Sequence, residues 1–184
     1  FCCGPPAACR PRAPMPNFSL KVKAELENVT DLSVPEDFVF FLKVRCGHCG
    51  EVCPNVVGVD PNNKDEMAGS RGEANLVIKC KFCSRENSVN VVSMSGVYTH
   101  DDSEASRFVE LAVFDCRGVE LCEFEPRSGW RCTGNGTSSV FDDVDLSDDF
   151  ADYDDKASSA VGIANFEHKI DKSGGGGKGK GKKK

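Results

Sequence analysis

Two pairs of cysteines, each separated by two residues, are the strongest chemical signal in the sequence. The pairs are Cys46-Gly47-His48-Cys49 and Cys80-Lys81-Phe82-Cys83. With this spacing one tight turn directs both sulfur atoms at the same ion, and two such turns make a tetrahedral set of thiolates that suits Zn²⁺. Four protein ligands leave no position for a reacting water, so such an ion is structural. The sequence therefore predicts one zinc ion per chain, with these metal ligands: Cys46, Cys49, Cys80 and Cys83.

The residues around the two pairs agree with a metal site. The 30 residues between Cys49 and Cys80 exceed the ~15–20 of a common zinc ribbon, but closing a longer loop costs only slightly more free energy. Gly50 follows the first pair and Ser84 the second. Because glycine adopts a left-handed backbone most easily, we expect the two turns to differ slightly. Basic residues flank the cysteines and would offset the −2 charge of a zinc tetrathiolate: Arg45, Lys79, Lys81 and Arg85.

Strands are expected to position both pairs. Phe18–Leu26 alternates apolar and polar side chains, which is typical of a strand with one buried face. Phe38–Val44 is apolar on both faces, which predicts a central strand that leads directly to Cys46. Leu76–Lys79 forms another strand and ends at Cys80. Each cysteine pair therefore follows the end of a strand.

The rest of the chain shows many short apolar runs separated by turn residues. We expect Val119–Phe124 to pair with the strand before it across the turn at Arg117-Gly118, and Asn28–Asp37 and His100–Ser106 to be irregular. The best helical candidate is short, Tyr153–Val161. This pattern predicts an all-β fold with short helical segments at most. The further strands are expected at Val56–Val59, Ser88–Ser93, Arg107–Phe114, Val119–Phe124 and Val161–Ile170.

The chain divides by composition into three parts. We expect residues 1–14, rich in proline, to be a disordered or non-native leader, 15–171 to form a zinc-binding β domain, and 172–184 to be a flexible Gly/Lys tail. The run before Cys46-Gly47 resembles the run before Cys116-Arg117-Gly118. A duplicated β unit is therefore an open interpretation, with halves 15–97 and 98–171 that share a core and a zinc site in the first half only.

Composition excludes several classes of protein. The chain has 184 residues, 39% of them hydrophobic and 28% charged, which suits one ordinary domain or two small ones. Its apolar runs, such as Phe38–Leu42, are far shorter than the ~20 residues of a membrane-spanning helix. Phe1–Pro14 lacks the apolar core of a secretory signal, so the 11 cysteines point to metal or free thiols in the cytoplasm, with nuclear access open, rather than disulfides.

The net charge of −6 is unevenly distributed. Six lysines lie in the tail from Lys172 onward, so the remaining chain has 17 basic and 29 acidic residues. An acidic body argues against a specific nucleic-acid groove. Asp142–Asp155 alone contains eight aspartates, which we interpret as a solvated acidic loop, with a docking surface for a basic partner as the alternative.

Several other cysteines and histidines are candidates for chemistry. Cys53 is either a spare ligand or a free thiol, and His48 inside the first turn is expected to face solvent. His100 and His168 stand alone, so a surface or hydrogen-bonded role is the default for both. In the second half, Cys116 ends a strand beside Arg117, and Cys122 alternates with Phe124 like a packed small hydrophobe. Cys132 follows Arg131, a cation that can lower a thiol pKa, which makes Cys132 the best redox candidate.

From Met15 to about Ile170 the sequence resembles the eukaryotic CXXC-motif-containing zinc-binding proteins. The resemblance implies a small, mainly β, intracellular protein whose zinc ligands map onto Cys46, Cys49, Cys80 and Cys83, and it implies no established reaction. Its blocks occur in one order along the chain: Leu20–Thr30, Phe41–Glu51, Arg71–Val89, Asp115–Gly118, Asp152–Lys156 and Ser159–Ile163.

We therefore predict a zinc-binding, non-enzymatic, monomeric protein that interacts with another protein, with a metal-handling partner as one subclass. No convergent acid, base and nucleophile is visible, so no catalytic residue is assigned. Two alternatives stay open. One is a thiol oxidoreductase similar to methionine sulfoxide reductases of the B type, with Cys132 as nucleophile and His168 or His100 nearby. The other is a zinc ribbon that contacts nucleic acid through its lysine tail, which the acidic body disfavours.

Overall fold

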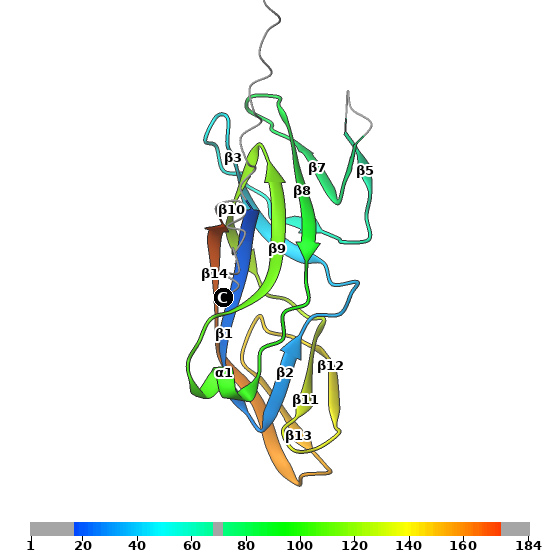
Figure 1. Ribbon diagram of the computed structural model, residues 1–184, viewed down its shortest axis with the longest axis vertical. Coiled ribbons are helices and arrows are strands. Elements are labelled where there is room, and N and C mark those ends of the chain that lie inside the picture. Colours follow the sequence, from blue (N-terminus) through cyan, green and yellow to red (C-terminus); the bar gives the residue numbers. More distant parts are fainter. Residues whose placement is uncertain (1–16, 68–71, 174–184) are drawn as a thin grey trace, which may run out of the picture.

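The computed structural model describes residues 17–67 and 72–173, an elongated arrangement of antiparallel β-sheets (Figure 1). The expected leader 1–14 and most of the tail lie outside the described residues. The largest sheet has six strands in the order β13 (Phe150–Asp154), β14 (Ser159–Ser173), β1 (Asn17–Glu27), β9 (Val109–Arg117), β8 (Glu86–Ser93) and β7 (Leu76–Lys79).

Three smaller sheets and one helix complete the described chain. One sheet has the order β10 (Val119–Glu125), β3 (Phe40–Cys46) and β4 (Val57–Val59). Another has the order β12 (Val140–Val144), β11 (Trp130–Gly134) and β2 (Val29–Ser33). The last pairs β5 (Asp65–Glu66) with β6 (Glu73–Ala74), and the helix is α1 (His100–Glu104). The predicted all-β class is confirmed, and no helix of the described ranges has the length and hydropathy to cross a bilayer.

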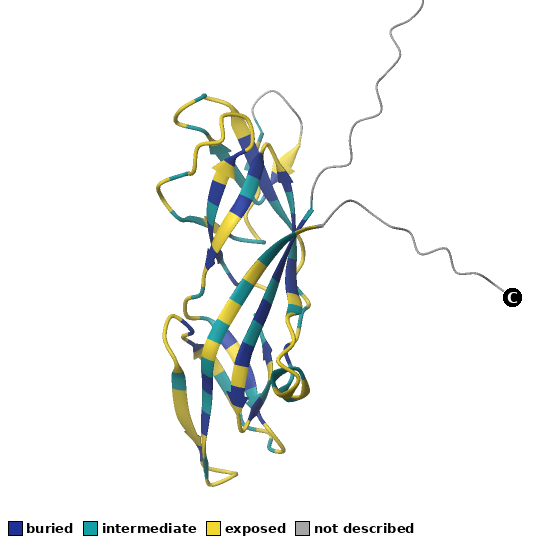
Figure 2. Ribbon diagram, turned by 90° about the vertical axis from the view of Figure 1, so that its left-hand side faces the viewer, coloured by how far each residue is buried: buried dark blue, intermediate teal, exposed yellow. Residues whose placement is uncertain are grey.

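Strand β1 shows why the large sheet forms. Its alternate residues Leu20 and Val22 are almost fully buried. On the opposite face, Lys21 and Lys23 form ion pairs with Asp171 and with a glutamate of the neighbouring strand β14. Alternation of buried and exposed residues recurs along the long strands in Figure 2. A strand with one apolar and one charged face buries the first and leaves the second in water.

An aromatic cluster joins the sheets into one core. The Phe40 ring of β3 contacts the rings of Phe38 and Phe114, with centroids 5.0 and 5.1 Å apart. Trp130 of β11 packs against Phe38 and Phe124 in the same cluster. Each of the three larger sheets draws strands from both 15–97 and 98–171, so these stretches share one core. Their origin by duplication stays a prediction.

The expected hairpin between Val119–Phe124 and the preceding strand is wrong. Strand β10 pairs with β3, whereas β9 pairs with β1 and β8. The chain changes sheets at Gly118, which has a φ of +73° and whose carbonyl accepts a hydrogen bond from the Gly47 N–H at 2.9 Å. A turn that leaves one sheet for another has the same glycine signature as a hairpin turn, so the sequence does not distinguish them.

Two segments expected to be irregular are ordered. Strand β2 lies within Asn28–Asp37 because Val29 and Leu32 are fully buried. Helix α1 lies within His100–Ser106 and begins with a capping box between Thr99 and Asp102. It has no buried residue, so it carries no apolar periodicity that would reveal a helix.

The predicted helix Tyr153–Val161 is wrong: this stretch contains the end of β13, a turn at 155–158 and the start of β14. The buried carboxylate of Asp154 accepts hydrogen bonds from the hydroxyls of Thr137 and Ser139, both at 2.6 Å, and from the Lys156 N–H at 2.9 Å. These donors, Ser139 first, lower the pKa of Asp154 to about 2. Part of the acidic segment is thus structural rather than a solvated loop.

Gly96 is expected to tolerate no side chain. A Cβ at this position would lie 2.2 Å from the Glu110 carbonyl oxygen and 2.4 Å from the Leu111 Cα, both on the backbone of β9. We expect Gly96→Ala to destabilise the protein by about 1–3 kcal/mol through overpacking, measured as a lower urea midpoint. At Gly136 the space is open, so Gly136→Ala should cost less, through backbone strain alone. Equal losses from the two variants would contradict the prediction.

Candidate metal centre

The first cysteine pair lies in a turn at the end of β3. The Cys46 N–H donates to the Glu51 carbonyl at 2.8 Å, and the Gly50 N–H donates to the Cys46 carbonyl at 2.9 Å. Gly50 has a φ of +79°, the left-handed conformation that glycine adopts most easily. This turn places Cys46 in a buried position and Cys49 in an exposed one.

The second pair lies in the turn between β7 and β8 and repeats the first turn. The Cys80 N–H donates to the Arg85 carbonyl at 2.8 Å, and the Ser84 N–H donates to the Cys80 carbonyl at 2.9 Å. Ser84 has a φ of 58°, so serine adopts the conformation that Gly50 has in the first turn. The two turns differ slightly, as expected: φ is 79° at Gly50 and 58° at Ser84, where the hydrogen bonds of the turn hold serine in a region that it rarely enters.

The two turns bring four sulfur atoms together. Each Sγ lies within 4.8 Å of the others. The distance is 3.7 Å between the Sγ atoms of Cys46 and Cys83, and 3.6 Å between those of Cys49 and Cys80. A disulfide needs about 2.05 Å, whereas the edge of a tetrahedron with Zn–S bonds of about 2.3 Å is about 3.8 Å. The spacing fits a tetrahedral metal site, and we call these four residues the sulfur cluster.

Hydrogen bonds from backbone amides lower the pKa of two thiols of the sulfur cluster, Cys46 and Cys80. The N–H groups of Cys49 and His48 donate to Cys46 Sγ and lower the pKa of Cys46 to about 6, against the opposing effect of desolvation. Amides of the second turn likewise lower the pKa of Cys80. The pKa of Cys49 is raised to about 12: the Glu51 N–H lowers it, but desolvation and the neighbouring sulfurs raise it more. Crowded thiolates resist further ionisation, and a divalent cation relieves that repulsion.

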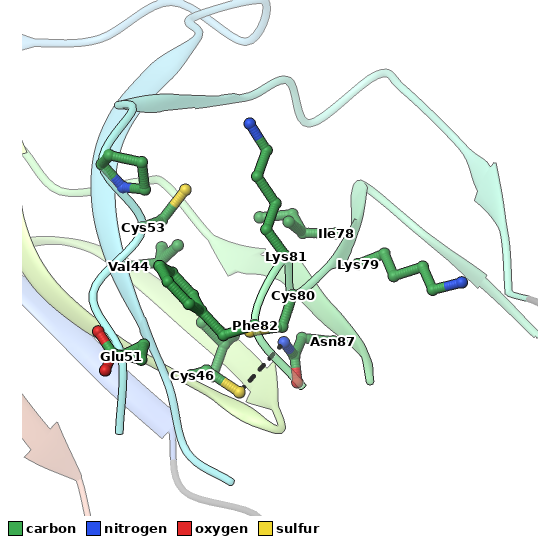
Figure 3. A pocket seen from close by; sticks show the side chains of 12 residues that line it. Val44, Cys46, Glu51, Cys53, Ile78, Lys79, Cys80, Lys81, Phe82 and Asn87 are labelled. Atoms are coloured by element: carbon green, nitrogen blue, oxygen red, sulfur yellow. Dashed lines mark hydrogen bonds between the residues drawn. The ribbon is translucent and has the colours of Figure 1, made fainter. Parts of the chain in front are cut away.

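Asn87 is a supporting residue that the sequence did not reveal. It is buried on β8, and its Nδ2 donates to Cys46 Sγ at 3.8 Å (Figure 3). Gly118 leaves room for it, because a Cβ there would lie 2.4 Å from Asn87 Oδ1. Hydrogen bonds to a ligand atom orient that ligand and favour its charged form. The only signal in the sequence is the position of Asn87 four residues after Cys83, and that spacing does not identify a donor.

Removing this donor should loosen metal binding. We expect Asn87→Leu to weaken zinc affinity about 10–100-fold, because the Cys46 thiolate loses a hydrogen bond. The measurement is zinc transfer to a chromogenic chelator under native conditions. Ser88→Ala is the matched control, since the buried Ser88 hydroxyl has no hydrogen-bond partner among the described residues. If Asn87→Leu and the control lose zinc at the same chelator concentration, the proposed support is wrong.

The histidines lie outside the sulfur cluster. His48 is exposed, as expected. His168 on β14 is half-buried, its Nε2 accepts the Phe124 N–H at 3.4 Å, and desolvation lowers its pKa. His100 lies near Asp101 and Glu104 on α1, at the exposed surface.

The cysteines of the second half are not placed as redox groups. Cys132 is fully buried, and desolvation followed by nearby aspartates raises its pKa to about 12. The expectation that Arg131 lowers the pKa of Cys132 is therefore wrong, because Arg131 forms an ion pair with Asp142. Cys116 is also buried, with a pKa raised by desolvation to about 12. These thiols are protonated at neutral pH and shielded, which disfavours Cys132 as a nucleophile.

Cys122 differs from its expected packing, because it is exposed. The pairing of β10 with β3 shifts between Leu121 and Glu123. This bulge places two successive residues, Cys122 and Glu123, on the solvent side, while Leu121 and Phe124 point inward. Alternation from Phe124 back to Cys122 therefore predicted the wrong face.

Thiol labelling should follow this burial. We expect iodoacetamide to modify Cys122 in the native protein and to leave Cys116 and Cys132 unmodified until the protein unfolds, because alkylation needs an accessible thiolate. Peptide mass mapping of briefly labelled protein measures each site. Rapid native labelling of Cys132 would contradict its placement in the core.

Comparisons with known proteins agree with the site. Residues 19–171 match the family described as "CXXC motif containing zinc binding protein, eukaryotic". The CXXC motif containing zinc binding protein of Bos taurus is 39% identical over 158 residues, covering 85% of this chain and 98% of the relative. The Xenopus laevis protein of the same name is 40% identical over 161 residues, covering 86% and 99%.

Two solved structures have a fold similar to that of this chain. The crystal structure described as C1orf123 has a TM-score of 0.79 and 36% identity to this chain, and the match covers 85% of this chain and 99% of that one. A hypothetical protein from Plasmodium falciparum has a TM-score of 0.76 and 26% identity, with 84% and 99% covered. The chain therefore belongs to the eukaryotic family of CXXC motif containing zinc binding proteins.

Proposed function

We propose that this protein binds one zinc ion through Cys46, Cys49, Cys80 and Cys83 and uses it to hold its fold. The observation that carries the proposal is the separation of 3.6–3.7 Å within two Sγ pairs from different turns. Four thiolates complete the coordination of zinc, so the ion has a structural role with no position for a reacting water.

The ion would act as a clasp between two sheets. Cys46 ends β3 and Cys49 follows it, whereas Cys80 and Cys83 lie in the turn that connects β7 and β8 of the six-stranded sheet. Both turns lie at the upper end of the molecule in Figure 1. At this end the metal–sulfur bonds would hold the two sheets together, as apolar packing does elsewhere in the molecule.

We further propose that the protein is a non-enzymatic module that binds another protein, with a metal-handling protein as one class of partner. It would act as a monomer in the cytoplasm, with access to the nucleus. Burial of Cys132 and Cys116 supports a non-enzymatic role, because these two thiols are shielded from solvent and burial raises the pKa of each. A methionine sulfoxide reductase role would need an activated nucleophile.

Cobalt substitution tests the coordination. A full-length protein refolded with Co²⁺ should show the strong visible absorption of a tetrahedral tetrathiolate, and zinc should displace it. Weak octahedral absorption would overturn the proposed ligand set. Proximity labelling in cells, with wild type and the Cys80→Ser variant, tests the interaction role. Reproducible absence of enriched proteins around wild type would count against it.

A further inference from the structure

An apolar pocket lies beside the sulfur cluster (Figure 3). We call it the clasp pocket, and its apolar lining comes from Val44, Cys53, Pro54, Ile78, Phe82 and Val119. Its cavity has a volume of about 70 Å³, whereas one water needs roughly 10–15 Å³ and two to four polar partners. The space suits an apolar group better than water.

The clasp pocket is distinct from the ion position. Cys46 and Cys80, one from each pair, line it, whereas Cys49 and Cys83 do not. The pocket therefore lies on one side of the sulfur cluster, between the arm that carries Val44 and the arm that carries Ile78. Because zinc would join these arms through Cys46 and Cys80, the width of the pocket would depend on the bound metal.

Phe82 marks this face as a contact surface. Its ring extends from the second turn toward Val44 in Figure 3, and the residue is 64% exposed. A large exposed apolar side chain such as Phe82 at the rim of an apolar hollow is typical of binding surfaces, where a partner removes it from water.

The rim is basic in a protein whose body is acidic. Lys79 and Lys81 line the pocket, with Glu51 as the one carboxylate, and both lysines are exposed. Neither lysine takes part in an ion pair between described residues. If the six lysines from Lys172 onward are left out, the chain has 17 basic and 29 acidic residues. The basic rim therefore differs in charge from the protein as a whole. Complementary charge attracts an acidic partner to it.

We propose that the clasp pocket receives a large apolar side chain from an acidic segment of a partner protein, and that it does so only when zinc is bound. This inference rests on the proposed zinc site and adds the chemistry of the partner. The apolar side chain packs against Phe82 and the pocket wall, while flanking carboxylates lie near Lys79 and Lys81. Loss of the metal separates the two arms and removes the binding surface.

The probe is a library of random peptides displayed on phage and selected on the zinc-loaded full chain. We expect enrichment of Leu, Phe or Trp flanked by Asp and Glu. Fluorescence anisotropy with the most enriched peptide then measures affinity. Phe82→Ser should weaken binding at least about tenfold, because it removes the ring that packs against the partner's apolar side chain. Lys81→Glu should have a similar effect, because it replaces attraction of the acidic segment by repulsion. Added salt should also weaken it.

The matched controls are Phe108→Ser and Lys64→Glu, which change exposed residues that do not line the clasp pocket. Both should bind the peptide like wild type, and all four variants should retain zinc. Chelation should abolish binding. Zinc-loaded protein that enriches no acidic apolar peptide, or that binds equally after Phe82→Ser, overturns the pocket proposal alone. Folded protein without stoichiometric zinc overturns the proposed function instead, and the two failures are distinguished by measuring metal in each preparation.

Discussion

Replacing Cys80 with serine is expected to abolish stoichiometric zinc binding and to lower the thermal midpoint by about 6–20 °C. Zinc binds comparable peptide sites with an apparent ~10–16 kcal/mol at neutral pH, as much as the entire stability of a typical domain, roughly 5–15 kcal/mol. The aromatic core retains part of the fold, so we expect a loss of about 3–5 kcal/mol, at roughly 2–4 °C per kcal/mol for a chain of this size. Calorimetry with parallel metal analysis measures both effects.

Cys122→Ser is the matched control for this experiment. Cys122 is exposed and lies outside the sulfur cluster, so the variant should keep its zinc and change stability by less than about 0.5 kcal/mol. Chelation of wild type should reproduce the Cys80→Ser midpoint, because both remove the same clasp. A Cys80→Ser protein with full zinc, or a midpoint equal to that of Cys122→Ser, would show that Cys80 is not a ligand.

Phe40→Ala is expected to destabilise the protein by about 3–5 kcal/mol while leaving zinc bound. Phe40 is fully buried at the centre of the aromatic cluster. Its ring contacts Phe38 and Phe114, and Phe124 lies with its centroid 6.4 Å away. Removing the ring leaves a cavity and forfeits these contacts. The urea midpoint and the zinc content of the folded fraction measure the two parts of the prediction.

Phe108→Ala gives the comparison, because Phe108 is 40% exposed and lies outside the core cluster. We expect it to lose less than about 1 kcal/mol, since a partly exposed ring loses less on truncation. If Phe40→Ala and Phe108→Ala cost the same, the aromatic cluster does not join the sheets as described. If folded Phe40→Ala protein lacks zinc, the metal site depends on the aromatic core, and the second part of the prediction is wrong.

The sequence predicts the local parts of this structure well. Spacing within Cys46–Cys49 and Cys80–Cys83 is short enough for one turn to determine where both sulfurs point, and the structure brings all four together. The strands that carry these turns were also predictable. Leu76–Ile78 is an apolar run that ends just before Lys79 and Cys80, and the alternation of Phe18–Leu26 appears as the buried face of β1.

Features that depend on distant segments were not predictable. Gly118 marks a turn, but its destination depends on the sheet that β10 joins. The bulge that exposes Cys122 arises from pairing with β3 and leaves no mark in the alternation of β10. Asn87 reaches Cys46 only because two turns far apart in sequence meet. Each case is set by tertiary contacts that a local pattern does not contain.

X-ray absorption at the zinc edge, on full-length protein purified without chelator and with its metal content quantified, tests the central claim most directly. We predict one zinc per folded monomer and a first shell of four sulfur atoms at about 2.3 Å. A first shell that contains nitrogen or oxygen, or a folded preparation without stoichiometric zinc, would contradict it.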